Sequence, residues 1–115
     1  MKRAAAPADV FRALGDEHRL RILDFIARGD ARCCSTVHGI CGCDVQNAIG
    51  LAQATVSHHL KILLEAQLIG AEKHGRWVRY QLTVTGANIA QTMLEGLYGA
   101  SLKIPESAPP RIAQD

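Results

Sequence analysis

Aromatic residues are scarce in this chain of 115 residues: only 4% of its positions are Phe, Trp or Tyr, although 48% are hydrophobic. A folded core must therefore be built mainly from Leu, Ile, Val and Ala. Such a core is thin in a chain that is long enough for one domain at most. We therefore expect apolar surface to be buried across the interface of a homodimer.

Long apolar runs are also missing. No stretch approaches the roughly 20 apolar residues that cross a bilayer, and the N-terminal sequence MKRAAAPADV lacks the apolar segment of a signal peptide. We expect no membrane partner and a cytoplasmic location. Thiols stay reduced there, so the four cysteines are interpreted as metal ligands or redox sensors rather than as structural disulfides.

Enzyme signatures are absent as well. The chain has no phosphate-binding loop, no cofactor fingerprint and no Cys-x-x-Cys motif. These absences argue against an enzyme, such as a thiol-dependent reductase, and against a small-molecule substrate. The net charge of +2 excludes little, because its distribution is more informative than its sum.

One segment, residues 51–68 (LAQATVSHHLKILLEAQL), predicts an amphipathic α-helix. Val56, Leu60, Leu63 and Leu64 recur at offsets of four, seven and eight, which marks one helical face. The opposite face carries short hydrogen-bonding groups and imidazoles. Because the segment follows a short predicted helix and a glycine turn, it is interpreted as the second helix of a helix-turn-helix, which enters the DNA major groove. An ordinary amphipathic core helix is the alternative.

A basic β-hairpin is predicted directly after this helix. Strand-forming residues fill 77–84, residues 68–73 supply the opposing strand, and His74-Gly75-Arg76 forms a tight turn. In this position a hairpin is typical of the wing of a winged helix, whose basic tip lies along the phosphate backbone. A tip that is merely solvated is the alternative.

The predicted DNA contacts come from the recognition helix and the wing. On the helix they are Gln53, Ala54, Thr55, Ser57, His58, His59 and Lys61, of which His59 lies nearer the apolar face. On the wing they are Lys73, His74, Arg76 and Arg79.

Four further helices are expected from apolar spacing. They cover residues 7–14, 16–29, about 43–49 and 85–100. Asp16 is a good N-cap for the second helix. The predicted inward residues are Leu20, Leu23, Ile26 and Ala27 in that helix, and Val45, Ala48 and Ile49 in the next.

The last predicted helix carries Ile89, Met93 and Leu97 at a spacing of four. This stripe is not needed to close the small core, so it suits a dimer interface. We therefore expect a mainly α, dimeric winged helix-turn-helix with a small β-hairpin over residues 1–102, followed by a disordered tail at 103–115.

Three features in order now carry a family resemblance: LGDEHRLRIL at 14–23, CGCDV at 41–45, and ATVSHHLKIL followed by GRWVRYQL within 54–82. Together they resemble the ArsR/SmtB family of metal-responsive winged-helix repressors. The resemblance covers about residues 8–98. It implies a homodimer that binds double-stranded operator DNA and releases it when an inducer binds.

The CGCDV segment is similar to the Cys-x-Cys-Asp-Leu box of family members that sense arsenite, antimonite, cadmium or lead. This resemblance places Cys41 and Cys43 at the two ligand positions. Gln46 departs from the pattern, because many arsenic sensors have a third cysteine there. Ala52 also departs, since the family often has a capping Ser or Thr. The last helix has no histidine, so the zinc or nickel site of other members is not expected.

The cysteines Cys33, Cys34, Cys41 and Cys43 lie within eleven residues, with His38 between them. Thiolates suit a soft ion. Arsenite or antimonite needs three thiolates in a pyramid, so we expect Cys33 or Cys34 to complete the site. Four thiolates could instead hold Cd, Pb or Zn, and a structural zinc, a redox switch or simply buried cysteines remain alternatives. His38 is interpreted as a loop residue.

The spacing of Cys41 and Cys43 links this site to DNA. Residues at i and i+2 point to different sides of a helix, so both thiolates cannot chelate one ion from within a regular turn. Either the helix begins after both cysteines, or binding unwinds its first turn. That helix packs against the recognition helix, so thiolate bonding could bias the dimer away from the geometry that matches two successive major grooves.

Overall fold

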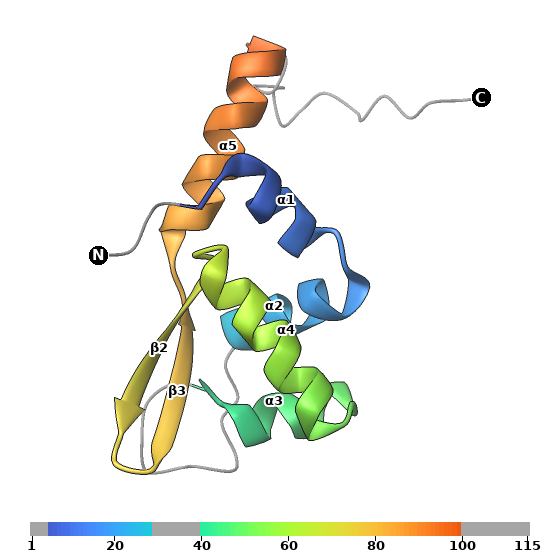
Figure 1. The fold of residues 1–115 in the computed structure, drawn as a ribbon, viewed down its shortest axis with the longest axis vertical. Helices are drawn as coiled ribbons and strands as arrows, with labels where there is room; N and C mark the ends of the chain where they lie inside the picture. The colour runs from blue at the N-terminus through green and yellow to red at the C-terminus, as the bar shows by residue number, and fades with distance from the viewer. Residues whose placement is uncertain (1–4, 29–39, 100–115) are drawn as a thin grey trace, which may run out of the picture.

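The computed structural model describes residues 5–28 and 40–99 and shows a mainly α fold with a small antiparallel sheet (Figure 1). The elements in chain order are α1 (Pro7–Leu14), α2 (Glu17–Arg28), β1 (Ile40–Cys41), α3 (Gly42–Ile49), α4 (Gln53–Glu65), β2 (Ile69–His74), β3 (Trp77–Leu82) and α5 (Val84–Tyr98). Cys33, Cys34, His38 and the tail at 103–115 lie outside the described residues, so the predictions for them stay predictions.

An aliphatic core holds these elements together, as the composition predicted. Val10 of α1, Ile22 of α2, Val45 of α3 and Leu63 of α4 are all completely buried, and Ile40 of β1 is 2% exposed. The buried hydrophobic residues in the described parts of the chain include no Phe, Trp or Tyr. Each helix therefore contributes one aliphatic face to a shared centre.

The inward stripe predicted for α2 is wrong in part. Ile22 and Ile26 are buried, whereas Leu20 is 49% exposed and Ala27 is also exposed. Apolar residues occur on more than one side of α2, so periodicity alone could not select the buried side; packing against α1, α3, α4 and β3 does. Ala48 of α3 is likewise exposed instead of inward.

The sheet has three strands, where the sequence predicted two. Its strand order is β1-β3-β2, with Ile40 opposite Tyr80 and Cys41 opposite Arg79. A strand of two residues shows no periodicity, and residues 40–41 lie outside every helix and strand that the sequence predicts. The addition matters because it joins the first predicted ligand position, Cys41, directly to the wing.

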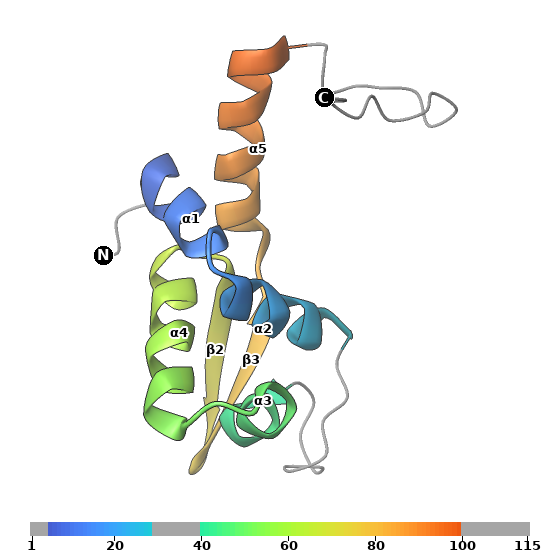
Figure 2. The same ribbon diagram turned by 90° about the vertical axis from the view of Figure 1, so that its right-hand side faces the viewer.

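The two ends of the molecule differ in character. α5 extends away at one end with α1 beside its base, whereas α3, the start of α4 and the hairpin tip lie at the other end (Figure 1). The hairpin lies along one side of the packed helices, with β2 contacting α4 and β3 contacting α2 and α3 (Figure 1 and Figure 2). The surfaces predicted for DNA therefore lie away from the helix predicted for dimerisation.

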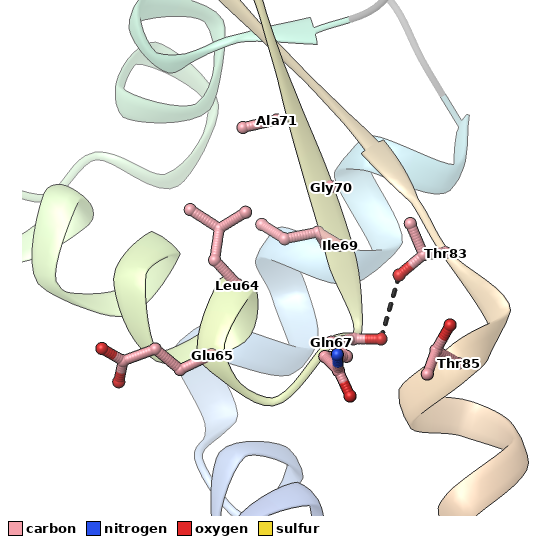
Figure 3. A pocket seen from close by; sticks show the side chains of 8 residues that line it. All are labelled: Leu64, Glu65, Gln67, Ile69, Gly70, Ala71, Thr83 and Thr85. Carbon is pink, nitrogen blue, oxygen red and sulfur yellow. Dashed lines mark hydrogen bonds between the residues drawn. The ribbon is translucent and has the colours of Figure 1, made fainter. Parts of the chain in front are cut away.

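The turn between α4 and β2 is tied to the start of α5. Gln67, whose φ is 61°, accepts a hydrogen bond at its carbonyl oxygen from Thr83 Oγ1 at 2.9 Å (Figure 3). The same oxygen accepts a hydrogen bond from the Gly86 amide at 2.7 Å. A Cβ at Gly86 would lie 2.4 Å from the Ala66 carbonyl oxygen. Glycine is therefore required there for the close approach of two backbones.

We expect Gly86→Ala to lower the free energy of unfolding by about 1–3 kcal/mol, because the added methyl overpacks a rigid backbone contact. Gly96→Ala is the matched control on the same helix, where a Cβ meets no heavy atom within 4 Å. It should be neutral or stabilising by about 0.5–1 kcal/mol. Denaturant unfolding measures both, and equal stabilities of the two variants would contradict this account of the junction.

Candidate functional site

The first two turns of α4 form an exposed polar surface. The described residues on it are Gln53, Ala54, Thr55, Ser57, His58 and Lys61, all of which are exposed. Val56, Leu60 and Leu63 turn inward, as predicted. Gly50, with a φ of 81°, closes α3 and lets the chain turn into α4. The backbone thus presents short polar side chains at one end of a helix, which is the arrangement that reads base edges in a groove.

The start of α4 has no side-chain cap. Ala52 is the N-cap residue and makes no capping hydrogen bond, as its departure from the usual Ser or Thr predicts. The orientation of α4 must therefore be held by contacts along its length rather than at its beginning.

A two-residue turn closes the wing. His74 pairs with Trp77 across the hairpin, so only Gly75 and Arg76 form the turn, and Gly75 adopts a φ of 63°. Lys73 and Arg76 are exposed at this tip. The tip therefore offers two accessible cations on a fixed backbone.

Arg79 lies differently from the other predicted wing contacts. Its side chain is only 13% exposed, donates to Glu72 Oε1 at 2.9 Å and contacts His74 Nε2. The hydrogen bond with His74 and the charge of Arg79 hold the pKa of Glu72 below its usual value. The charge of Arg79 is thus paired with Glu72 on the sheet, and its contact with phosphate stays a prediction.

Unlike the other predicted contacts on α4, His59 is buried. It is 7% exposed on the buried side of α4, and its Nδ1 lies 3.2 Å from a guanidinium nitrogen of Arg19. This burial agrees with the predicted position of His59 nearer the apolar face. The ring contacts Arg19 and is not part of the exposed surface that includes Ser57 and His58.

Cys41 and Cys43 converge at the start of α3. Cys41 is the N-cap residue, with φ −94° and ψ 168°, and Cys43 lies inside the first turn. Their sulfur atoms are 2.6 Å apart. The helix thus begins between the two cysteines, an arrangement that the sequence argument did not consider. Because Cys41 is extended, both sulfurs can face one point while the helix stays intact.

Asp44 joins this pair and was not singled out from the sequence. It is 3% exposed; its Oδ2 accepts from the Cys41 amide at 3.3 Å and lies 3.5 Å from Cys41 Sγ. One ligand atom from each of Cys41, Cys43 and Asp44 falls within 4.8 Å of the others. The signal that could have found Asp44 is its position three residues after an N-cap, where an acidic side chain completes a capping box.

The site borders the sheet. Burial, together with negative charge at Cys41, raises the pKa of Tyr80, the β3 residue opposite Ile40. Two cysteine sulfurs and one carboxylate therefore meet in a poorly solvated place between a helix terminus and a strand. Such a donor set suits a thiophilic ion. Cys33 and Cys34, which are also predicted ligands, lie outside the described residues.

Comparisons with known proteins point to one family. A helix-turn-helix domain family matches residues 14–69. An arsenic resistance transcriptional regulator of Pseudomonas putida is 31% identical over 88% of this chain and 73% of its own length. An arsenical resistance operon repressor of Bacillus subtilis is 38% identical over 63% of this chain and 61% of its own.

Solved structures agree with this relationship. An ArsR-like transcriptional regulator from a Rhodococcus species is 27% identical and superposes with a TM-score of 0.64, covering 84% of this chain and 82% of its own. Within the described residues, 5–28 and 40–99, none of the helices has the length and apolar character that spanning a membrane requires. The relatives are helix-turn-helix regulators rather than enzymes. The chain belongs to the ArsR family of winged-helix transcriptional repressors.

Proposed function

We propose that this chain is a metalloid-responsive repressor that acts in the cytoplasm, binds operator DNA as a homodimer and releases it when arsenite or antimonite binds its cysteine thiolates. The observation that carries the proposal is the convergence of the Cys41 and Cys43 sulfurs at the start of α3, the helix that packs against α4. The names of two relatives, regulators of arsenic and arsenical resistance, support the choice of inducer.

The inducer would bind by condensation. Each cysteine S–H reacts with one As–OH group of arsenite, so an As–S bond forms and one water leaves for each thiol. Cys41 and Cys43 supply two of the three thiols, and Cys33 or Cys34 supplies the third. The product is a three-thiolate pyramid that needs no other ligand.

Asp44 favours a second candidate, a repressor that responds to Cd, Pb or Zn. A buried carboxylate 3.5 Å from a thiol adds negative charge, which stabilises a divalent cation more than a neutral arsenite adduct. Its oxygen could also serve as a ligand beside the two sulfurs. The same cysteines would also suit a thiol-redox regulator or a structural zinc site, and the serine substitutions below distinguish a structural zinc site from a sensor.

Homodimerisation would follow from the apolar surface of α5. Ile89 is half-buried, whereas Met93 is 37% exposed and Leu97 is 71% exposed, so the stripe with a spacing of four is largely uncovered in the single chain. Pairing through α5 would leave α4 and the wing of each chain at the far ends. Two recognition helices could then enter successive major grooves of a palindromic operator.

Release would start at the capping box of α3. In the thiol form, Cys41 directs both its amide and its sulfur toward Asp44. A bound thiolate has lost its proton and lies beside the carboxylate, so this cap is weakened. The disturbed first turn belongs to α3, and Cys41 also pairs with Arg79 of the wing. Allosteric coupling of about 1–3 kcal/mol is typical and is enough to loosen an operator complex.

Arg76→Ala should weaken operator binding without changing the preferred sequence, because phosphate contacts position the protein and carry no sequence information. The slope of log K against log salt should flatten by about 0.9 for each phosphate that the variant no longer neutralises. Arg28→Ala, which removes an exposed charge paired with Asp24, is the control and should leave affinity unchanged. An Arg76→Ala protein with the wild-type affinity and salt slope would take the wing out of the interface.

Ser57→Ala and His58→Ala should each reduce discrimination between operator and random DNA, since a good base contact contributes about 1–3 kcal/mol. Affinity for random DNA should change little. Competition binding with both kinds of duplex measures the ratio. Full operator selectivity in both variants would mean that α4 does not read the bases.

Cys41→Ser and Cys43→Ser should each retain operator binding and lose the response to arsenite, because a serine hydroxyl is barely ionised at neutral pH. Of Cys33→Ser and Cys34→Ser, one should no longer release the operator when arsenite is added, and the other should respond nearly as the wild type does. Gel-shift titrations, with circular dichroism to check folding, measure these outcomes.

Three other results would change this interpretation. If Cys33→Ser and Cys34→Ser reduced the response to the inducer equally, a four-thiolate site and a metal such as Cd would be favoured. A structural zinc would make all four substitutions unfold the domain and abolish DNA binding. Loss of DNA binding in metal-free, folded Cys43→Ser protein would rule out the sensor mechanism.

A further inference from the structure

A polar cluster on the buried side of the recognition helix joins α1, α2 and α4. Its centre is Arg19, whose side chain is 12% exposed. Arg19 donates from Nε to the Ala13 carbonyl at 2.8 Å and from one terminal nitrogen to the Arg12 carbonyl at 3.1 Å. Its other terminal nitrogen lies 3.2 Å from His59 Nδ1. One guanidinium therefore contacts the end of α1 and the middle of α4 while its own backbone belongs to α2.

Arg19 is itself held in place. Asp16 caps α2 by accepting from the His18 amide at 2.8 Å and from the Arg19 amide at 3.2 Å. The Asp16 carboxylate also lies 3.9 Å from the Arg19 guanidinium. Although burial opposes it, these hydrogen bonds and the Arg19 charge lower the pKa of Asp16, so the carboxylate is ionised at neutral pH. The fork of Arg19 is thus pre-oriented before it meets His59.

We propose that Arg19 is a positioning residue for DNA recognition, which holds α4 against the end of α1 through neutral His59. The inference deepens the proposed function and rests on α4 being the DNA-reading helix. Because α4 lacks a side-chain cap at Ala52, its orientation depends on contacts of this kind. His59 directly follows Ser57 and His58, so a rotation of α4 at this point displaces the groups that meet the bases.

The contact requires one protonation state of His59. A guanidinium only donates hydrogen bonds, so Nδ1 can accept only when the ring is neutral and carries its proton on Nε2. Burial lowers the pKa of His59 from 6.5, with Arg19, His18 and His58 acting in the same direction and Asp16 against it. The charged and titratable groups that act on this ring are Asp16, His18 and Arg19 from α2 and its N-cap, and His58 from α4 itself. Protonated His59 would place a second cation against Arg19 and break the hydrogen bond between the two side chains.

The hydrogen bond between Arg19 and His59 depends on pH. Neutral His59 is the populated form above pH 6.5, so this hydrogen bond is fully formed there. It is lost as the pH falls through the lowered pKa of the folded state. Protonation of exposed histidines near phosphate acts the other way and strengthens binding. A comparison of two proteins that share those exposed histidines therefore isolates the contribution of His59.

The first test uses the full chain and an operator that the wild-type protein selects from random-sequence DNA. Arg19→Lys keeps the charge but cannot make a planar fork to three acceptors. We expect its operator affinity at about pH 7.5 to fall about 10-fold or more, which corresponds to about 1.4 kcal/mol. Arg28→Lys, in the exposed pair with Asp24 on the same helix, should bind as the wild type does.

The second test is the pH profile of His59→Asn. The asparagine oxygen can accept near the position of Nδ1 and does not titrate. At about pH 7.5 its operator affinity should be within about twofold of the wild type, and the ratio of wild-type Kd to variant Kd should rise as the pH falls below 6.5. This profile decides the question if Arg19→Lys does not fold.

Parallel pH profiles for the wild type and His59→Asn would overturn the proposal. So would a folded Arg19→Lys protein that has a lower Tm but an unchanged operator affinity, since Arg19 would then be merely structural. A wild-type protein that selects no sequence from the library would instead refute the proposed DNA-reading surface. In that case the inference falls together with the proposed function.

Discussion

The backbone conformation of Cys41 is the constraint on which the proposed inducer site and its proposed link to DNA depend. Cys41 is extended, so it ends β1 and also serves as the N-cap of α3. A helical conformation at this residue would turn its sulfur away from Cys43. It would also remove the strand pair with Arg79 and the amide donor to Asp44. One residue thus connects the thiol pair, the helix-turn-helix and the wing.

The recognition helix is held on two sides by interactions of different kinds. On one side it packs against α3, whose first turn carries the cysteines. On the other side, His59 meets Arg19, which reaches the end of α1. α1 contacts α5, the helix proposed for the dimer interface. Under the proposed function, ligand binding at the cysteines would therefore change the position of α4 through α3, and α1 would link α4 to the proposed dimer interface.

Much of this architecture could be predicted from the sequence because its signals are local. The spacing of Val56, Leu60 and Leu63 identified α4, and the glycine turn before a strand-forming run identified the hairpin. The missing cap at Ala52 could also be predicted.

What the sequence could not show depends on partners distant in the chain. β1 is too short to carry a pattern, and its existence depends on pairing with β3. Helical periodicity placed His59 nearer the apolar face, but its partner Arg19 is forty residues away, so the contact between the two could not be predicted. In α2, Leu20 and Ile22 are equally apolar, and only packing determines that Ile22 is buried.

The most direct test of the central claim is operator release from the reduced, metal-free protein, titrated with arsenite, antimonite, Cd, Pb and Zn and followed by fluorescence anisotropy. The account predicts that arsenite and antimonite release the DNA and that release reverses when a competing dithiol removes the metalloid. Release by Cd, Pb or Zn alone would transfer the sensing role to the site that includes Asp44. An operator complex that none of these ions dissociates would contradict the account.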